Sequence, residues 1–432
     1  MLLLSILMAL IKCFDSVHLD KLLVPRLCPV IHTPRLCLQF PIPHSQCPMP
    51  NAPFPIPIKM VHFNVGFQHF NSFADITLSL AKTLDKIGIP ISVEPSEIAS
   101  HVTRNSTDEE NDLLVKWMNT PPSDLFQIKW SHYWKPYFLK ELKGHLNLEL
   151  FAINYEFAKN HDDYDYWIYD AVNNSSHKLA VSQYSKNVLI KAGCATDKVS
   201  VMPLGFNPLI SQLYSPKPQK TQKDIKYILH MTNSFDLYRF GTDLAIQAFY
   251  QEFKDNPNVE LIIKDGGKNP DVIVEHLMDI EKQFGKLKSK VQVRPKFCTK
   301  AELADLYLSA DAFLAPFRGE GFAIKILDAF AAGLPVAMTM YGGPTEYANT
   351  TNCYPITYDL IPVGKCYDTQ YLKIRNAPHW AEPNVQSVRQ QLRRIVEDPM
   401  RFQIAQKARE TANLFNWEAS AQKLLRLMRE LF

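Results

Sequence analysis

The second half of the chain alternates short apolar runs with longer amphipathic segments. Runs such as YILHM and VELII are rich in branched side chains and are bounded by polar residues, as buried parallel strands are. Each run is followed by a segment with apolar residues at helical spacing, and this alternation continues from residue 224 to residue 339. Repeated strand–helix units predict a doubly wound α/β domain with a parallel sheet.

The first half opens in the same way after Met60. VHFNV (61–65) predicts a buried strand, and SFADITLSLAKTLDKIG (72–88) predicts a helix that Ser72 caps and Gly88 ends. Four further apolar runs predict more strands of an α/β layer, namely DLFQIKW, LNLELFAIN, HKLAVS and KVSVMPL. A chain of 432 residues, 46% of them hydrophobic, can fill two such cores.

Breaks in the pattern predict the domain boundaries. Ten of the 30 prolines lie between Pro25 and Pro57, where fixed φ angles and missing amide donors disfavour helix and central strand. We expect this leader to be disordered and the functional protein to begin at Met60; a proline-rich linker behind a membrane anchor is the alternative. The predicted parts are a leader (1–58), an N-terminal Rossmann-like domain (59–207), a linker (208–223), a C-terminal Rossmann-like domain (224–415) and a last helix packing back on the N-terminal domain (416–432).

Charge and cysteine content narrow the class of protein. The formal net charge is +3 without a block of Lys or Arg, which argues against a nucleic-acid partner and leaves a small anionic ligand open. Cys194, Cys298, Cys353 and Cys366 lack metal-binding spacing and predict reduced thiols in a cytoplasmic protein. Asp163-Tyr164-Asp165 has the spacing of a divalent-metal motif but no matching sheet context, so no metal site is expected.

The loop after the run AFLAPF is the first place to look for a ligand. In open α/β sheets ligands bind beyond the carboxyl ends of the strands, where helix N-termini direct amides at anions. This loop reads RGEGFAIK (318–325), and Gly319 and Gly321 allow a ligand to approach the backbone closely.

The string GEGFAIKILDAFAAGLPVAMT (319–339), followed by GGPTEY, resembles the donor-site signature of glycosyltransferase family 4, two glutamates separated by seven residues. The resemblance implies the GT-B fold, two Rossmann-like domains facing across a cleft. Glu320 matches the first glutamate, which contacts the transferred sugar, and Asp328 stands where the second glutamate bonds the ribose. The diphosphate would be held by the amides of Gly321, Phe322, Ala323 and Ile324. For an isolated pair of acids, a helix cap and a solvated side chain would be the preferred interpretation, and the surrounding strand–loop–helix–strand string reverses this preference.

Basic partners for the leaving diphosphate are expected in the first turn of the same domain. The family often has Arg-Lys-Gly where this chain has Arg239-Phe240-Gly241, so Phe240 removes one expected cation. Arg239 and Lys264 are the candidates for neutralising the phosphates, and ordinary surface charge is the alternative for both.

Two candidates lie in the N-terminal half. KWSHYWKPYF resembles a family segment whose histidine faces the transferred sugar, which makes His132 a candidate catalytic residue, with a purely structural histidine as the alternative. Gly66 is a candidate for the loop that approaches acceptor or diphosphate, although a plain turn fits as well. Asn154-Tyr155-Glu156 and the segment 201–205 also resemble family landmarks and are expected to shape the cleft.

The resemblance implies a retaining glycosyltransferase (EC 2.4) that uses a UDP- or GDP-sugar as co-substrate and no other cofactor. The acceptor would be a saccharide, lipid-linked or other hydroxyl, in polysaccharide or glycoconjugate synthesis, in the cytoplasm or at the cytoplasmic face of a membrane. Phe240 and Asp328 leave open an inactive GT-B scaffold or regulatory subunit, and a sugar-nucleotide epimerase on the same fold is a third hypothesis.

Overall fold

The chain divides after residue 54 into two units, and every residue that the computed structural model describes lies in the second. The leader 1–58, Gly66, His132 and Asp163-Tyr164-Asp165 lie outside the described residues. The described residues are 60–65, 72–95, 108–121, 127–129, 147–154, 156, 176–216, 226–267, 269–295, 298–363 and 378–431.

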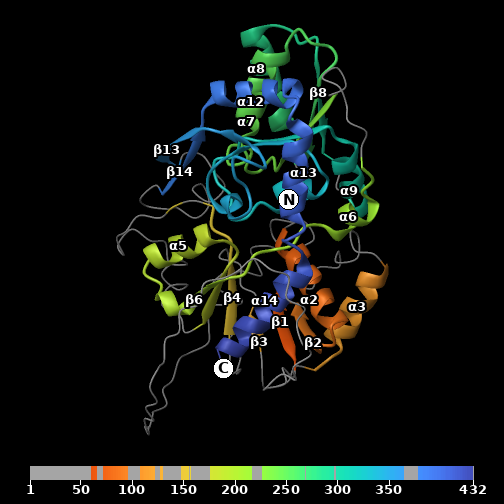
Figure 1. Ribbon diagram of the computed structural model, residues 1–432, viewed down its shortest axis with the longest axis vertical. Helices are drawn as coiled ribbons and strands as arrows, with labels where there is room; N and C mark the ends of the chain where they lie inside the picture. Colours follow the sequence, from red (N-terminus) through yellow and green to blue (C-terminus); the bar gives the residue numbers. More distant parts are fainter. Residues whose placement is uncertain are drawn as a thin grey trace, which may run out of the picture. The chain divides into compact units, whose positions relative to one another are not determined.

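The first sheet has six parallel strands in the order β2-β1-β3-β4-β5-β6 (Figure 1). Its inner side chains, such as Val61, Phe63 and Leu179, are fully buried, as expected for strands covered on both faces. The strands are β1 (Val61–Val65), β2 (Ile91–Pro95), β3 (Gln127–Lys129), β4 (Asn147–Phe151), β5 (His177–Ala180) and β6 (Val199–Val201). The helices are α2 (Ser72–Lys86), α3 (Asp108–Met118) and α5 (Gln183–Lys191), with the short turn η4 (Thr196–Lys198).

The second sheet is also parallel and has the order β12-β11-β10-β7-β8-β9. The order reverses between β7 and β10, which is the topological switch point at which such sheets bind ligands. The strands are β7 (Tyr227–Thr232), β8 (Glu260–Asp265), β9 (Lys290–Arg294), β10 (Ala312–Ala315), β11 (Val336–Thr339) and β12 (Tyr354–Ile356). The helices between them are α7 (Thr242–Phe253), α8 (Asp271–Phe284), α9 (Lys300–Ser309) and α10 (Ile324–Ala331).

The remaining elements connect and follow these two sheets. They are α6 (Pro208–Leu213), η6 (Gly343–Glu346), the antiparallel pair β13 (Tyr358–Pro362) and β14 (His379–Pro383), and the helices α12 (Val385–Glu397), α13 (Arg401–Ala412) and α14 (Trp417–Glu430).

Several helices of the protein begin at side-chain caps. Thr299 and Glu302 form a capping box at the start of α9, and Asn416 accepts a hydrogen bond from the Ala419 amide at the start of α14.

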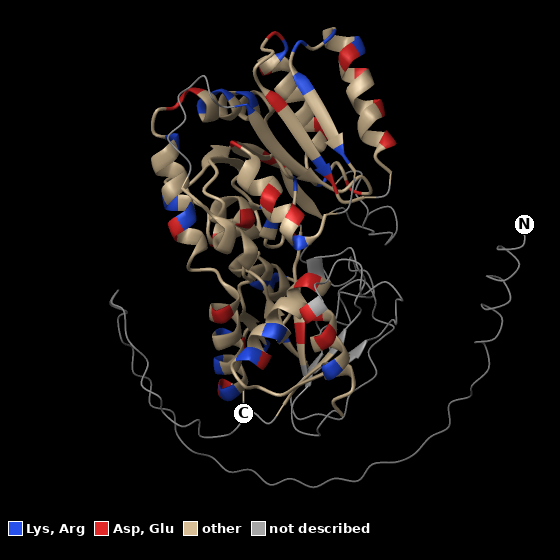
Figure 2. Ribbon diagram, turned by 90° about the vertical axis from the view of Figure 1, so that its right-hand side faces the viewer, with Lys and Arg blue, Asp and Glu red and all other residues tan. Residues whose placement is uncertain are grey.

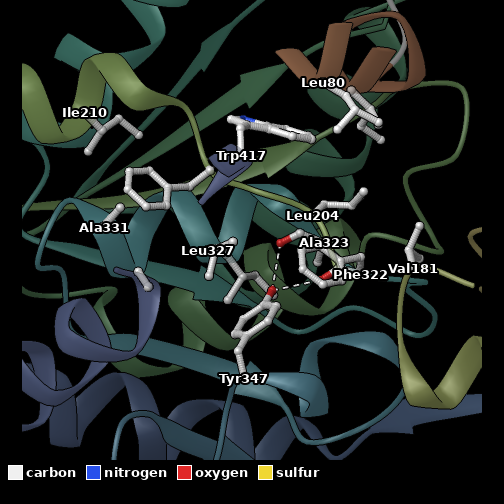
Figure 3. Packing of buried hydrophobic residues seen from close by; sticks show 14 of the residues in the cluster. Leu80, Val181, Leu204, Ile210, Phe322, Ala323, Leu327, Ala331, Tyr347 and Trp417 are labelled. Carbon is white, nitrogen blue, oxygen red and sulfur yellow. Dashed lines mark hydrogen bonds between the residues drawn. The ribbon is translucent and has the colours of Figure 1, made fainter. Parts of the chain in front are cut away.

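One cluster of buried apolar side chains contains residues of both sheets and of α14. Figure 3 shows part of it, with Leu80 of α2, Trp417 of α14 and Phe322 of the loop before α10. Helix α14 packs on α2. A side chain at Gly205 would place its Cβ 2.6 Å from the Trp417 nitrogen, so the backbone entering α14 lies directly against the segment after β6.

Figure 2 shows acidic and basic positions on the helices in that view. Both parallel sheets, and with them the predicted α/β class, are present in the structure.

Candidate functional site

The candidate site is formed by the loops that follow β7 and β10, the two strands that meet at the switch point of the second sheet. The two loops are bonded to each other: the Arg318 amide donates to the Arg239 carbonyl (2.8 Å), and Arg239 Nη1 donates to the Gly319 carbonyl (3.1 Å). The sequence candidates Arg239 and Glu320 therefore lie side by side although they are far apart along the chain.

Glu320 is the centre of a cluster of charged side chains. Its Oε1 accepts a hydrogen bond from Lys325 Nζ at 2.6 Å and lies 3.4 Å from Arg239 Nη1. Arg239 also donates from Nε to Asp236 at 2.5 Å. The Phe240 ring lies against both cations, with its centroid 3.6 Å from Lys325 Nζ and 4.1 Å from the Arg239 guanidinium carbon.

The Lys325 ammonium titrates close to physiological pH. Burial lowers its pKa to about 8, because a buried amine loses the solvation of its charge. Glu320 raises this pKa and the neighbouring Arg239 lowers it. Lys325 is thus largely protonated at pH 7, and a modest change in its surroundings can shift its charge.

The backbone before α10 has an unusual conformation. Ala323, the N-cap of α10, has φ 59° and ψ 65°, which is the left-handed region that alanine normally avoids. The Tyr347 hydroxyl donates to the carbonyls of Phe322 (2.9 Å) and Ala323 (2.8 Å), as the dashed lines in Figure 3 show. Because the N–H of the next residue points away from each carbonyl across a planar peptide, Tyr347 directs the amides of Ala323 and Ile324 to the opposite side.

The GGPTEY segment packs directly under this loop. The Gly343 amide donates to the Glu320 carbonyl at 2.8 Å. A Cβ at Gly343 would lie 1.7 Å from the Gly321 carbonyl oxygen, so only glycine allows this contact. The GGPTEY segment therefore packs against the backbone of the loop 318–323 and supports it.

The four amides expected to hold a diphosphate are not equivalent. The Gly321 amide donates to Asn154 Oδ1 at 3.1 Å, and the Gly321 carbonyl accepts from Ser182 Oγ at 2.8 Å, so this residue is bonded to the N-terminal half. The amides of Ala323 and Ile324 have no acceptor among the described residues. They are the donors that an anion at the start of α10 would meet.

Arg318 is a structural residue of the same loop. Its guanidinium forms a two-bond pair with Asp243 (2.8 and 2.8 Å) and another with Glu382 (2.6 and 2.7 Å). These bonds fix the loop to α7 and to β14.

Lys264 lies at the end of β8, one strand beyond Arg239. Its Nζ donates to the Asp265 carbonyl at 2.7 Å, and burial lowers its pKa. Asp265 Oδ1 accepts from the amides of Ser234 and Gly267 (both 2.8 Å) and ties the β7 loop to the end of β8. The structure thus brings Arg239, and not Lys264, into contact with Glu320.

Asp328 lies inside the protein and contacts the segment after β6. It is 4% exposed, and its Oδ1 accepts a hydrogen bond from the Asn207 amide at 2.8 Å. Burial raises the pKa of this carboxyl to about 7, and the Asn207 bond partly opposes the shift. The contact gives Asp328 a structural role, and ribose binding by Asp328 stays a prediction.

Three residues of the site did not emerge as candidates from the sequence. Lys325, Tyr347 and Ser182 come from three separate segments and meet only in the fold. The GGPTEY string pointed to the region of Tyr347 but not to its bonds. A single sequence carries no signal that separates Lys325 from a solvated lysine in the first turn of a helix.

A surface hollow of about 640 Å³ lies at the far end of α7 and is lined by residues 250–252 and 254–256 together with Phe284 and Arg389. The Glu320 cluster lies instead at the start of α7, beyond the carboxyl ends of the strands. Because ligands of open α/β sheets bind at those ends, the hollow is not the candidate donor site.

In the described ranges, no three His, Cys, Asp or Glu side chains are grouped closely enough to hold a metal ion. The helices of the same ranges include none with the length and apolar character needed to span a bilayer.

Two parallel Rossmann-like sheets with a charged site at the switch point of the second define a chain with the GT-B glycosyltransferase fold. The comparison with solved structures agrees. HepE of Anabaena in complex with UDP and glucose superposes with a TM-score of 0.57 at 15% identity, over 86% of this chain and 100% of that one.

Sequence comparison agrees with the resemblance. Residues 226–359 match the family model of the glycosyl transferases group 1. Mannosylfructose-phosphate synthase of Agrobacterium fabrum is 32% identical over 107 residues, 24% of this chain and 23% of that protein. D-inositol 3-phosphate glycosyltransferase of Corynebacterium diphtheriae is 24% identical over 241 residues, 53% of this chain and 49% of that protein. The chain thus matches 23% to 49% of the length of these curated relatives.

Proposed function

We propose that the protein is a retaining glycosyltransferase that moves a sugar from a nucleotide-diphosphate sugar, such as a UDP- or GDP-sugar, to a hydroxyl acceptor. The observation that carries this proposal is the Glu320 carboxylate, paired with Arg239 and Lys325 beside the N-terminus of α10. A carboxylate can bind sugar hydroxyls, and amides and cations can bind a diphosphate. The match of residues 226–359 to the glycosyl transferases group 1 model supports the same reaction class.

Each group has a proposed role. Glu320 accepts hydrogen bonds from the transferred sugar and stabilises the positive charge that grows as the glycosidic bond breaks. The amides of Ala323 and Ile324 hold the diphosphate, and Arg239 neutralises the negative charge on the departing phosphate. Asp328 contributes to ribose binding, directly or through a water molecule, because its side chain is shorter than glutamate.

Retention of configuration is proposed to follow from attack of the acceptor hydroxyl on the face from which the nucleoside diphosphate leaves. The leaving phosphate takes the proton of that hydroxyl, so no protein nucleophile is needed. His132 and Gly66 are proposed to orient sugar and acceptor from the N-terminal half. Cationic side chains and helix amides perform the work that a metal ion performs in other transferases, so transfer is expected to continue in excess chelator.

For the acceptor we propose a chemical class and no particular molecule. The two curated relatives are named for a mannosylfructose phosphate product and for D-inositol 3-phosphate, and they match only part of this chain. We propose a saccharide, lipid-linked or other hydroxyl acceptor, in the cytoplasm or at the cytoplasmic face of a membrane.

A scaffold or regulatory subunit without turnover is the second candidate. Two observations favour it: Phe240 stands where the family often has lysine, and the Asp328 carboxylate is already bonded inside the protein. Such a protein would keep the fold and lose the chemistry.

A donor screen separates these functions. UDP- and GDP-sugars are incubated with the full chain and a panel of hydroxyl acceptors, with and without EDTA, and released nucleoside diphosphate is measured. An enzyme releases diphosphate with at least one donor and keeps this activity in EDTA. Binding of a nucleotide sugar without any release would favour the scaffold. Activity lost in EDTA and restored by manganese would contradict the metal-free mechanism.

A further inference from the structure

We infer that Lys325 is a donor-binding residue whose ammonium moves from the Glu320 carboxylate to the diphosphate when the donor binds. This inference rests on the proposed function and adds to it a residue that replaces the cation missing at position 240. The starting observation is that Lys325 Nζ bonds Glu320 Oε1 at 2.6 Å, while Arg239 Nη1 lies 3.4 Å from the same oxygen.

The two cations differ in how firmly they are held. Arg239 has other partners in its own loop and across it, Asp236 Oδ2 and the Gly319 carbonyl. The Lys325 ammonium bonds Glu320 and packs on the face of Phe240, and the described residues offer it no further polar partner. A lysine also has a flexible stem and a compact charge, so Lys325 is the cation that can move.

The charges of the cluster match this exchange. In this cluster Glu320 and Asp236 carry two negative charges, and Arg239 and Lys325 carry two positive charges. A donor diphosphate adds negative charge beside the same cations. Transfer of the ammonium would give the phosphate a cationic partner and release Glu320 Oε1 to accept a hydrogen bond from the donor sugar. One movement would therefore prepare both halves of the donor site.

The position of Lys325 favours the diphosphate as its second partner. It is the second residue of α10, next to the Ala323 and Ile324 amides that meet an anion at the start of that helix. Its Nζ lies 3.6 Å from the centre of the Phe240 ring. A lysine at position 240 would therefore carry its own amine into the region that the Lys325 amine occupies.

The exchange has a pH signature. The charged or titratable groups around the Lys325 amine are Glu320 from the β10 loop, Arg239 and Asp236 from the β7 loop, and His230 from β7. Burial lowers the pKa of His230 to about 4, so this ring stays neutral above pH 6. Burial lowers the pKa of Lys325 to about 8, so the amine loses its charge, and its attraction for phosphate, as the pH rises from 7 to 9.

Moving the charge from position 325 to position 240 tests the inference. Binding of UDP and of GDP to the full chain is measured by calorimetry at pH 7. Four proteins are compared: the wild type, Lys325→Met, the double variant Phe240→Lys/Lys325→Met, and Lys282→Met. Lys282 is an exposed lysine of α8 paired with Asp279, so its variant is the matched control for loss of one charge. We expect Lys325→Met to bind the nucleotide roughly ten- to a hundredfold more weakly, as for the loss of one charge-assisted hydrogen bond. The double variant should recover most of this loss, and Lys282→Met should bind like wild type.

A conservative variant gives an independent readout if Lys325→Met fails to fold. Lys325→Arg keeps a charge that does not titrate below pH 9, so its nucleotide affinity should stay nearly constant from pH 7 to 9 while that of the wild type falls. Both proteins bind the same nucleotide, so ionisation of the nucleotide affects both pH profiles equally and does not alter the difference between them. Two results overturn this inference but leave the proposed function standing. One is that the wild type binds the nucleotide and Lys325→Met binds it with the same affinity. The other is that the wild type and Lys325→Arg have the same pH profile of binding. A wild-type protein that binds neither nucleotide overturns the proposed function as well.

Discussion

At the scale of single residues, the unusual feature is that one carboxylate oxygen serves two cations. Glu320 Oε1 contacts both Lys325 and Arg239, and this pairing keeps a buried lysine charged, since the carboxylate raises the pKa that burial lowers. The charge of Glu320 therefore matters for the protonation of Lys325 as well as in the proposed transition state.

Glu320→Gln keeps the shape of the side chain and removes its charge. We expect the protein to fold and turnover to fall by roughly ten- to a thousandfold, the range of one lost transition-state contact. The pKa of Lys325 should fall further, because the group that raises it is gone. Diphosphate release measures the first effect, with Glu275→Gln on the exposed face of α8 as the control. Unchanged turnover in Glu320→Gln would contradict the assignment of the site.

The buried Asp328 predicts a dependence of stability on pH. Burial raises the pKa of Asp328 in the folded protein to about 7 from the ordinary value of 3.8, so the folded state holds its proton more tightly than the unfolded chain. The stability that this group contributes is fully present below pH 3.8 and is lost as the pH rises through 7. Asp328→Asn keeps the acceptor for the Asn207 amide and removes the titration.

Urea unfolding at pH 5 and pH 8 measures this effect. We compare the free energy of unfolding of Asp328→Asn with that of the wild type at each pH. The difference, variant minus wild type, should be about 1 to 3 kcal/mol larger at pH 8 than at pH 5, because only the wild type loses stability as the pH rises. Asp305→Asn on the exposed face of α9 should show no such difference. A variant that differs from wild type by the same amount at both pH values would show that Asp328 does not titrate as proposed.

At the scale of elements, the start of α10 is held in a strained conformation by its neighbours. Tyr347 bonds two carbonyls of the loop and Gly343 packs against a third, so the surrounding structure maintains the left-handed Ala323. The strain places the amides of Ala323 and Ile324 where an anion can meet them.

Ala323→Gly should relieve this strain. Alanine in the left-handed region costs about 1 to 2 kcal/mol relative to glycine, and the loss of one buried methyl group offsets part of the gain. We expect a net rise of about 0.5 to 1 kcal/mol in the free energy of unfolding, measured by thermal or urea denaturation. Ala301→Gly, at an exposed ordinary position in α9, should lower stability instead, and a destabilised Ala323→Gly would refute the account of the loop.

At the scale of the whole chain, the sequence predicted the features that depend on a local pattern of apolar and polar residues. The apolar runs YILHM and VELII predicted buried strands, which β7 and β8 confirm. The α/β GT-B fold is confirmed as well, and residues 226–359 match the family model of the glycosyl transferases group 1. The Glu320 loop could be found because its chemistry is contained in one short string.

Contacts between distant segments could not be predicted in this way. Lys325 meets a phenylalanine 85 positions earlier, and Asp328 meets the amide of Asn207, 121 positions earlier. Such pairs depend on strand order and loop packing, which periodicity does not encode. His132 and Gly66 lie outside the described residues, so their roles stay predictions.

The central claim, that the loops after β7 and β10 hold the donor, can be tested by amide hydrogen exchange. The full chain is compared with and without a saturating concentration of the nucleotide sugar that performs best in the donor screen. Slower exchange is expected in residues 233–241 and 319–327, because the ligand accepts hydrogen bonds from these amides and excludes water from them. Unchanged exchange in both segments, or protection confined to the hollow at residues 250–256, would contradict the claim.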